Sequence, residues 1–234
     1  MLAVFRRDFK AYFTSPLGYV FISAFLVVNS LYFFIVNIMS GSGDLVYMFS
    51  FIMFLMVFLT PLLTMRLISE ELKQKTDQLI FTAPVSVSGF VVGKFLAAFG
   101  VFVLSLCTTL IYVLIVAMFG TLSVSLLVGN YIAILAVAMS FISIGLFMSS
   151  LTENQLVSAI MTLAAFVGLY ILDMARNAFN QAIVTKVLNW ISMFERYRSF
   201  TMGLFSLSDF VFYISVCAIF LFLTARSLEK KRWN

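Results

Sequence analysis

Long stretches without a charged side chain dominate the pattern of apolar and polar positions along the chain. They cover residues 11–43, 45–65, 95–152, 154–172 and 210–225. A helix rises about 1.5 Å per residue and the apolar core of a bilayer is about 30 Å thick, so one crossing needs about 20 apolar residues. The longest stretch has 58 residues. Turn-forming residues between Gly120 and Asn130 divide it into two crossings.

The pattern therefore predicts an all-α integral membrane protein, with one transmembrane domain over residues 1–234. Its six transmembrane helices are expected at 17–39, 46–68, 95–118, 130–150, 155–174 and 208–227. The strands of a transmembrane β-barrel alternate apolar and polar residues. Runs such as Phe99–Val116 do not alternate, which argues against a barrel.

Residues 1–14 predict a further helix, which we expect to lie in the membrane interface. Its apolar side chains recur at helical spacing: Leu2, Phe5, Phe9 and Tyr12. Its charged side chains lie opposite them: Arg6, Arg7, Asp8 and Lys10. Such a division of faces is typical of interfacial helices. A cleaved signal peptide is not expected, because the following apolar stretch is far longer than a signal-peptide core.

The basic residues predict the orientation of the chain. Six crossings place both termini on one side, and eleven of the 15 basic residues fall on that side: Arg6, Arg7, Lys10, Arg66, Lys73, Lys75, Lys94, Arg226, Lys230, Lys231 and Arg232. The positive-inside rule assigns this side to the cytoplasm, so both termini are expected there. These residues flank the membrane instead of forming one basic face, so no nucleic-acid partner is expected.

Composition excludes several classes of function. Only 15 basic and 10 acidic residues occur among 234, and the mean hydropathy is +1.10, which excludes a soluble monomer. The chain has no His and two Cys, so the usual zinc sites and the Ser–His or Cys–His catalytic arrangements lack their residues. An intramembrane enzyme is disfavoured because no paired carboxylates fall within the crossings. We expect no metal, no cofactor and no catalytic residue.

Residues 69–94 form the only long cytoplasmic loop of the predicted topology. The loop holds three of the ten acidic residues: Glu70, Glu71 and Asp77. Its start favours a short helix in which Glu71 pairs with Lys75 four residues later. Two interpretations remain open. The loop is either a solvated turn that only fixes topology, or a docking surface, since a simple reversal needs few residues and short helices are common recognition elements.

Short sequence elements follow one another in a particular order along nearly the whole chain. They are Ser15-Pro16-Leu17-Gly18-Tyr19, Pro61, Thr64-Met65-Arg66, Ser69-Glu70-Glu71, Thr76, Leu79, Thr82, Pro84, Gly93-Lys94 and Leu228-Glu229-Lys230-Lys231-Arg232-Trp233. In this order and spacing the chain resembles the permease subunits of ABC-2-type transporters, especially the gliding-motility-type branch. It departs from the family at Lys75-Thr76-Asp77-Gln78, where Gly-Thr followed closely by Glu is usual.

The resemblance implies an exporter subunit in the bacterial inner membrane. Such a subunit pairs with a second permease, as a homodimer or a heterodimer, and a separate ATP-binding subunit drives it from the cytoplasm. The chain itself has no phosphate-binding loop of the Gly-x-x-x-x-Gly-Lys-Ser/Thr type. The resemblance also implies that residues 177–205 re-enter the membrane from the extracytoplasmic side. Membrane lipid is the remaining expected partner.

The resemblance assigns roles to two sets of residues. Those that would couple to the ATP-binding subunit are Glu70, Glu71, Lys73, Lys75, Thr76, Asp77, Gln78, Leu79 and Pro84. Those of the interface helix are Arg6, Arg7, Phe9 and Lys10. The alternative function is a membrane anchoring or assembly protein, in which the same loop recruits a cytoplasmic partner without transport.

Overall fold

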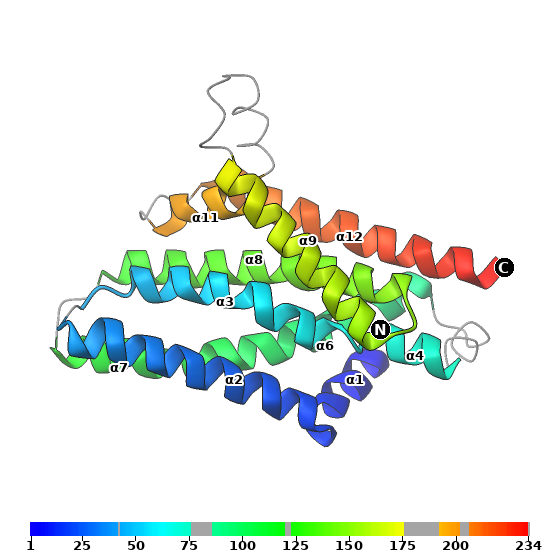
Figure 1. Cartoon of the computed structure of the whole chain (residues 1–234), viewed down its shortest axis with the longest axis horizontal. Helices are drawn as coiled ribbons and strands as arrows, with labels where there is room; N and C mark the ends of the chain where they lie inside the picture. Colours follow the sequence, from blue (N-terminus) through cyan, green and yellow to red (C-terminus); the bar gives the residue numbers. More distant parts are fainter. Residues whose placement is uncertain (42, 76–85, 120–122, 176–191, 202–205, 234) are drawn as a thin grey trace.

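A computed structural model describes residues 1–41, 43–75, 86–119, 123–175, 192–201 and 206–233. Within these residues the regular structure is helical and contains no strand. The elements are α1 (Leu2–Thr14), α2 (Pro16–Phe33), the π-helix η1 (Phe34–Met39), α3 (Val46–Thr64), α4 (Ser69–Gln74), α6 (Val87–Thr108), α7 (Leu110–Phe119), α8 (Val124–Leu151), α9 (Gln155–Ala175), α11 (Met193–Thr201) and α12 (Leu207–Trp233) (Figure 1).

Six helical segments are long and apolar enough to cross a membrane, as predicted. They are Pro16–Met39, Val46–Gln74, Val87–Phe119, Val124–Leu151, Gln155–Met174 and Leu207–Lys231. The start of the third segment differs from the prediction, which continued the loop to residue 94. The Ser86 hydroxyl accepts a hydrogen bond from the Gly89 N–H, so this N-cap begins α6 at Val87. Lys94 is consequently a helical residue.

Helix α8 lies at the centre of the bundle, between α3 and α12, and it also contacts α6, α9 and α11 (Figure 1). Small residues fill much of its buried surface: Ala133, Ala136, Ala138, Ser140, Ser143, Gly145 and Ser149. Small residues let helix backbones approach closely, which is a common basis for helix association in membranes.

The closest contact between α3 and α8 depends on Gly145. A Cβ at this position would lie 2.3 Å from Thr64 Oγ1 and 2.9 Å from Thr64 Cβ. One turn further along α8, the Ser149 hydroxyl accepts hydrogen bonds from the N–H groups of Ile68, at 3.1 Å, and Ser69, at 3.0 Å. Ser149 thus supplies a partner for the first N–H groups of α4, whose own N-cap residue Ile68 has no side-chain oxygen.

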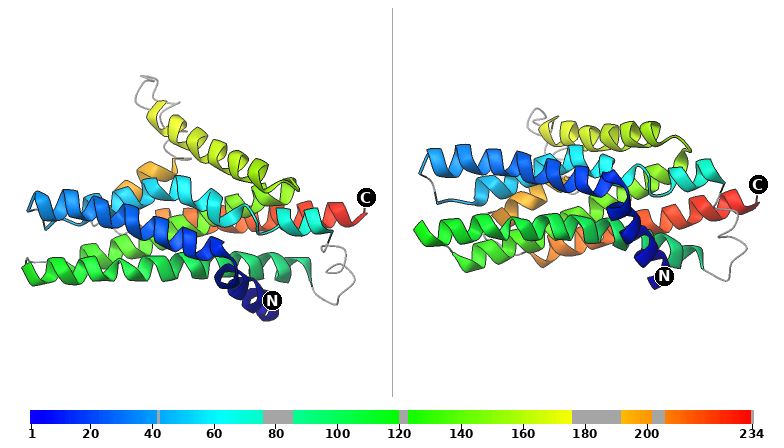
Figure 2. Two further views of the ribbon diagram at one scale, coloured as in Figure 1. Left: turned by 60° about the horizontal axis from the view of Figure 1, so that its bottom comes forward. Right: turned by 90° about the horizontal axis from the view of Figure 1, so that it is seen from below.

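Helix α1 lies across one end of the bundle (Figure 2) and packs against α6. Glycines on α6 make room for it. A Cβ at Gly93 would lie 3.0 Å from the Met1 carbonyl oxygen, and one at Gly100 would lie 3.1 Å from the Phe9 ring. The predicted amphipathic face is partly right: Phe9 packs against the core and Tyr12 is buried. Asp8 was assigned to the polar face, and that is wrong, because it is only 8% exposed.

The predicted re-entrant segment, 177–205, contains α11. This helix packs against α8 and α9 and buries Met193, Tyr197 and Phe200. The Tyr213 hydroxyl of α12 donates a hydrogen bond to the Met193 carbonyl, at 2.6 Å. Residues 177–191 and 202–205 lie outside the described part of the chain, and re-entry into the membrane stays a prediction.

We predict that Gly145→Ala destabilises the protein by about 1–3 kcal/mol, because the added methyl group overpacks the contact with Thr64. Gly129→Ala is the matched control on the same helix, since a Cβ there meets nothing within 4 Å. It should be neutral or stabilising by less than about 1 kcal/mol. Unfolding midpoints in detergent measure both effects, and equal shifts would contradict the assigned contact.

Candidate functional site

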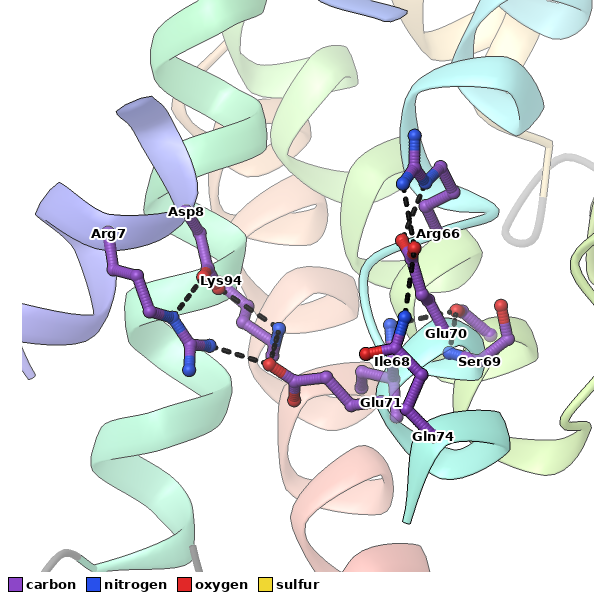
Figure 3. A network of polar contacts seen from close by, with 10 residues as sticks. Arg7, Asp8, Arg66, Ile68, Ser69, Glu70, Glu71, Gln74 and Lys94 are labelled. Atoms are coloured by element: carbon purple, nitrogen blue, oxygen red, sulfur yellow. Dashed lines mark hydrogen bonds and ion pairs between the residues drawn. The ribbon is translucent and has the colours of Figure 1, made fainter. Parts of the chain in front are cut away.

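Four charged side chains from three helices meet at the end of the bundle where α1 and α4 lie. The Lys94 ammonium of α6 lies 3.0 Å from Asp8 Oδ2 and 3.0 Å from Glu71 Oε1 (Figure 3). The Arg7 guanidinium contacts the same two carboxylates, through Nε at 2.7 Å from Asp8 Oδ1 and through Nη2 at 2.6 Å from Glu71 Oε1. We call Arg7, Asp8, Glu71 and Lys94 the charge cluster. It connects α1, α4 and α6.

Burial decides how strongly the charge cluster constrains these helices. The Lys94 side chain is 3% exposed, and its ammonium also lies 4.9 Å from the centre of the Phe90 ring. Removing an ammonium from water costs several kcal/mol unless opposite charges and hydrogen bonds compensate. Asp8 and Glu71, from two other helices, provide that compensation. The native position of Lys94 therefore requires α1 and α4 to stay in place.

Tyr12 adds a second connection from α1 to the bundle. Its hydroxyl donates a hydrogen bond of 2.7 Å to the Leu63 carbonyl near the end of α3. Burial raises the pKa of Tyr12 far above its ordinary value, and the negative charge of Asp8 raises it further. The phenol consequently remains protonated and keeps its role as a donor. The nearby Arg7 stays charged: burial lowers its pKa, but the hydrogen bonds and charges of Asp8 and Glu71 raise it by more.

A separate ion pair joins the turn after α3 to α4. Arg66 contacts Glu70 through two parallel interactions, Nε to Oε2 at 2.6 Å and Nη2 to Oε1 at 2.7 Å. Bidentate pairs of this kind are among the stronger and more directional ion pairs. The two neighbouring glutamates of α4 thus point in different directions, Glu70 toward Arg66 in the turn after α3 and Glu71 toward α1 and α6 (Figure 3).

An open pocket with a volume of about 460 Å³ lies between these groups. All six charged residues named above line it, together with Ala11, Tyr12, Thr14, Ser15, Leu17, Leu67 and Gln74. The walls come from α1, the start of α2, the corner between α3 and α4, and α6.

The site brings together part of the predicted set. Glu70, Glu71 and Arg7 lie in it, whereas Arg6, Lys10, Lys73 and Lys75 are exposed around it. Glu71 points toward Arg7 and Lys94 instead of the expected Lys75, and Lys75 ends α4 in the left-handed conformation, with φ of 55°. The other predicted coupling residues lie outside the described part of the chain: Thr76, Asp77, Gln78, Leu79 and Pro84.

Sequence reasoning missed four residues of the site, namely Asp8, Tyr12 as a hydrogen-bond donor, Arg66, and Lys94 as a buried charge. A usable signal existed in each segment. Lys94 is the only charged residue between Ser86 and Thr152, within a run that is otherwise apolar or small. Asp8 is the only acidic residue among the first forty. A lone charge in an apolar helix indicates a buried ion pair. Asp8, as the only acidic residue before the first crossing, was a candidate partner for Lys94.

Within the described ranges, no group of three or more Cys, Asp or Glu side chains is placed to hold a metal ion. The arrangement suits mechanical connection and the binding of charged groups. The chain is a helical protein with six segments able to cross a membrane, so the class that fold and site define is a multi-pass membrane protein. No protein-family model matches the chain, and no curated protein matches it.

We predict that Lys94→Met lowers the free energy of unfolding by about 3–5 kcal/mol, because it leaves Asp8 and Glu71 with one cation between them. Adding Asp8→Asn to this variant should restore part of the loss, since one cation and one carboxylate then remain. Lys10→Met on the exposed side of α1 is the control and should change little. Denaturation in mixed detergent micelles measures all three. Strictly additive effects of Lys94→Met and Asp8→Asn would contradict the pairing.

Proposed function

We propose that this chain is the permease subunit of an ATP-driven exporter of the ABC-2 type, and that a separate ATP-binding subunit docks on α4 and the segment after it. The observation that carries the proposal is the attachment of α4 to the bundle. This helix of six residues contacts α1 and α6 through Glu71 and α8 through Ser69, and its Glu70 pairs with Arg66 in the turn that follows α3. A push on α4 would therefore reach α1, α6 and α8 at once.

The two sides of α4 support a docking role. Ser69 and Leu72 are buried, whereas Lys73, Gln74 and Lys75 are exposed. Its inner side is fixed and its outer side offers a basic surface to a partner. Charge complementarity would favour an acidic surface on the ATP-binding subunit and would mainly set the orientation and rate of docking.

The distribution of charge favours an external energy source. Ion-coupled transporters usually carry ionisable residues near the middle of the membrane. The charged residues of the six crossing segments lie near their ends: Arg66, Glu70, Glu71, Lys73, Lys94, Asp173, Asp209, Arg226, Glu229, Lys230 and Lys231. ATP hydrolysed by a partner is consistent with this pattern and with the missing phosphate-binding loop.

In the proposed mechanism, closure of two ATP-binding subunits moves α4 in each of two permease subunits. Because Lys94 is buried and paired with carboxylates from α1 and α4, α1, α4 and the start of α6 move together as one unit. Rigid-body movement of packed helices is a common form of conformational switch. Exposed apolar side chains such as Leu31 and Ile35 on the first crossing, or Leu114 and Met118 on the third, would face lipid or the second permease.

A membrane anchoring protein is the second candidate, because the same exposed surface of α4 would also recruit a partner that performs no transport. The two functions differ in what the assembled complex does. Vesicles containing the purified complex would move a substrate in one direction on addition of ATP only if the chain is a permease.

We predict that an ATP-hydrolysing protein with a phosphate-binding loop co-purifies with the full chain from its native membrane. Lys73→Glu should weaken this association by about tenfold or more, because it reverses the charge on the exposed side of α4. Lys10→Glu is the matched control on α1 and should leave it unchanged. The measurements are the amount of partner recovered and its rate of ATP hydrolysis. Co-purification that survives both changes equally would exclude α4 as the docking surface.

A further inference from the structure

The open pocket beside the charge cluster lies at the ends of two of the segments that are able to cross a membrane. The first crossing segment begins at Pro16, directly after the pocket residue Ser15. The second ends at Gln74, which also lines the pocket. The headgroup region borders the apolar core at this level. A group that enters the pocket from the membrane would therefore be the polar end of a lipid.

Two guanidinium groups on different walls provide hydrogen-bond donors. Arg7 reaches the pocket from α1 and Arg66 from the turn between α3 and α4. Each uses Nε and Nη2 for its carboxylate partners. The Nη1 group of each carries two further N–H donors. Planar guanidinium groups are well suited to phosphate oxygens, and both of these groups line the same pocket.

The pocket is nevertheless electrically balanced. Its three cations, Arg7, Arg66 and Lys94, face three carboxylates, Asp8, Glu70 and Glu71. A ligand with only negative charge would be repelled by the carboxylates, and one with only positive charge by the cations. A group that carries a phosphate and an ammonium a short distance apart satisfies both. Apolar side chains complete the wall: Ala11, Leu17 and Leu67.

We propose that this pocket binds the headgroup of a zwitterionic phospholipid that has a primary ammonium, namely phosphatidylethanolamine. Its phosphate lies between Arg7 and Arg66, its ammonium donates hydrogen bonds toward Glu70 and Glu71, and the start of its acyl chains contacts Leu17. The bound lipid connects α1 to the corner between α3 and α4. This site does not depend on the proposed transport function and is measured on the chain alone.

The test uses the full chain, stripped of lipid in detergent, with added dioleoyl-phosphatidylethanolamine and detection by native mass spectrometry. Arg7→Gln and Arg66→Gln should each weaken binding by about tenfold, the effect of losing one charge-assisted contact. Arg6→Gln is the matched control, because Arg6 is exposed beside Arg7 and does not line the pocket. A loss with Arg6→Gln as large as with Arg7→Gln would overturn the site in favour of general surface attraction.

A second pair of variants leaves every charge unchanged, so it remains informative if the arginine variants fold poorly. Ala11→Phe places a ring in the pocket and should abolish binding, whereas Ala3→Phe adds the same ring at an exposed position of α1 outside it. Equal binding by both variants would overturn the pocket as the site.

The choice of lipid tests the chemistry. Dioleoyl-phosphatidylcholine, whose ammonium has no N–H, and anionic dioleoyl-phosphatidylglycerol should both bind at least about tenfold more weakly. Equal or tighter binding of either would overturn the assigned ammonium contact. Soluble glycerophosphoethanolamine distinguishes a lipid from a free phosphate compound. If glycerophosphoethanolamine displaces the lipid at an equal concentration, the pocket recognises the free headgroup, and a membrane lipid is overturned as the ligand. If it does not displace the lipid at that concentration, a membrane lipid is supported.

Discussion

The enclosure of the Lys94 ammonium is the interaction on which the arrangement of this end of the protein depends. A lysine with 3% of its side chain exposed would be expelled or neutralised without opposite charges close by. Asp8 on α1, 86 positions earlier in the chain, provides one carboxylate, and Glu71 on α4 provides the other. Helices α1, α4 and α6 are therefore held in one geometry by an electrostatic requirement, in addition to the apolar contacts between them. The charge cluster and the Arg66–Glu70 pair both line the pocket at this end of the bundle.

Close approach of backbones makes this electrostatic arrangement possible. The Lys94 side chain reaches Asp8 because Gly93 and Gly100 let α1 lie directly on α6. Similarly, Gly145 lets α3 approach α8, which brings the hydroxyl of Ser149 to the first N–H groups of α4. Small residues thus lie close to the polar contacts that they allow: Gly93 directly precedes Lys94, and Gly145 lies one turn before Ser149. Another polar contact between helices joins Ser140 of α8 to α12, where its hydroxyl donates to the Tyr213 carbonyl at 2.9 Å.

The six crossings could be predicted from sequence because missing charges and the thickness of a bilayer are enough to define them. The first helix, at residues 2–14, was predictable from the spacing of its apolar residues, although Asp8 was assigned to the wrong face. That error and the missed role of Lys94 have one cause: a charge is placed in water by default, and only a partner far away in sequence makes burial favourable. The sequence pattern placed the start of the third crossing at residue 95, whereas α6 begins at Val87. This earlier start depends on one N-cap hydrogen bond at Ser86. The Glu71–Lys75 pair was reasonable for an isolated helix, but α4 ends at Gln74 and Glu71 turns toward two other helices.

The N-terminal hydrogen bonds of α4 have a consequence for how the protein is made. Their acceptor, Ser149, follows Ile68 by 81 residues. A ribosome adding about 5–20 residues per second needs several seconds to synthesise that interval. During this time Ile68 and Ser69 have been synthesised, but Ser149, whose hydroxyl accepts hydrogen bonds from their N–H groups, has not. Helix α4 reaches its final form only when the fourth crossing has entered the membrane beside α3. A protein that recognises α4 would therefore select chains whose synthesis has progressed through α8, and its association would follow the packing of α8 against α3 in time.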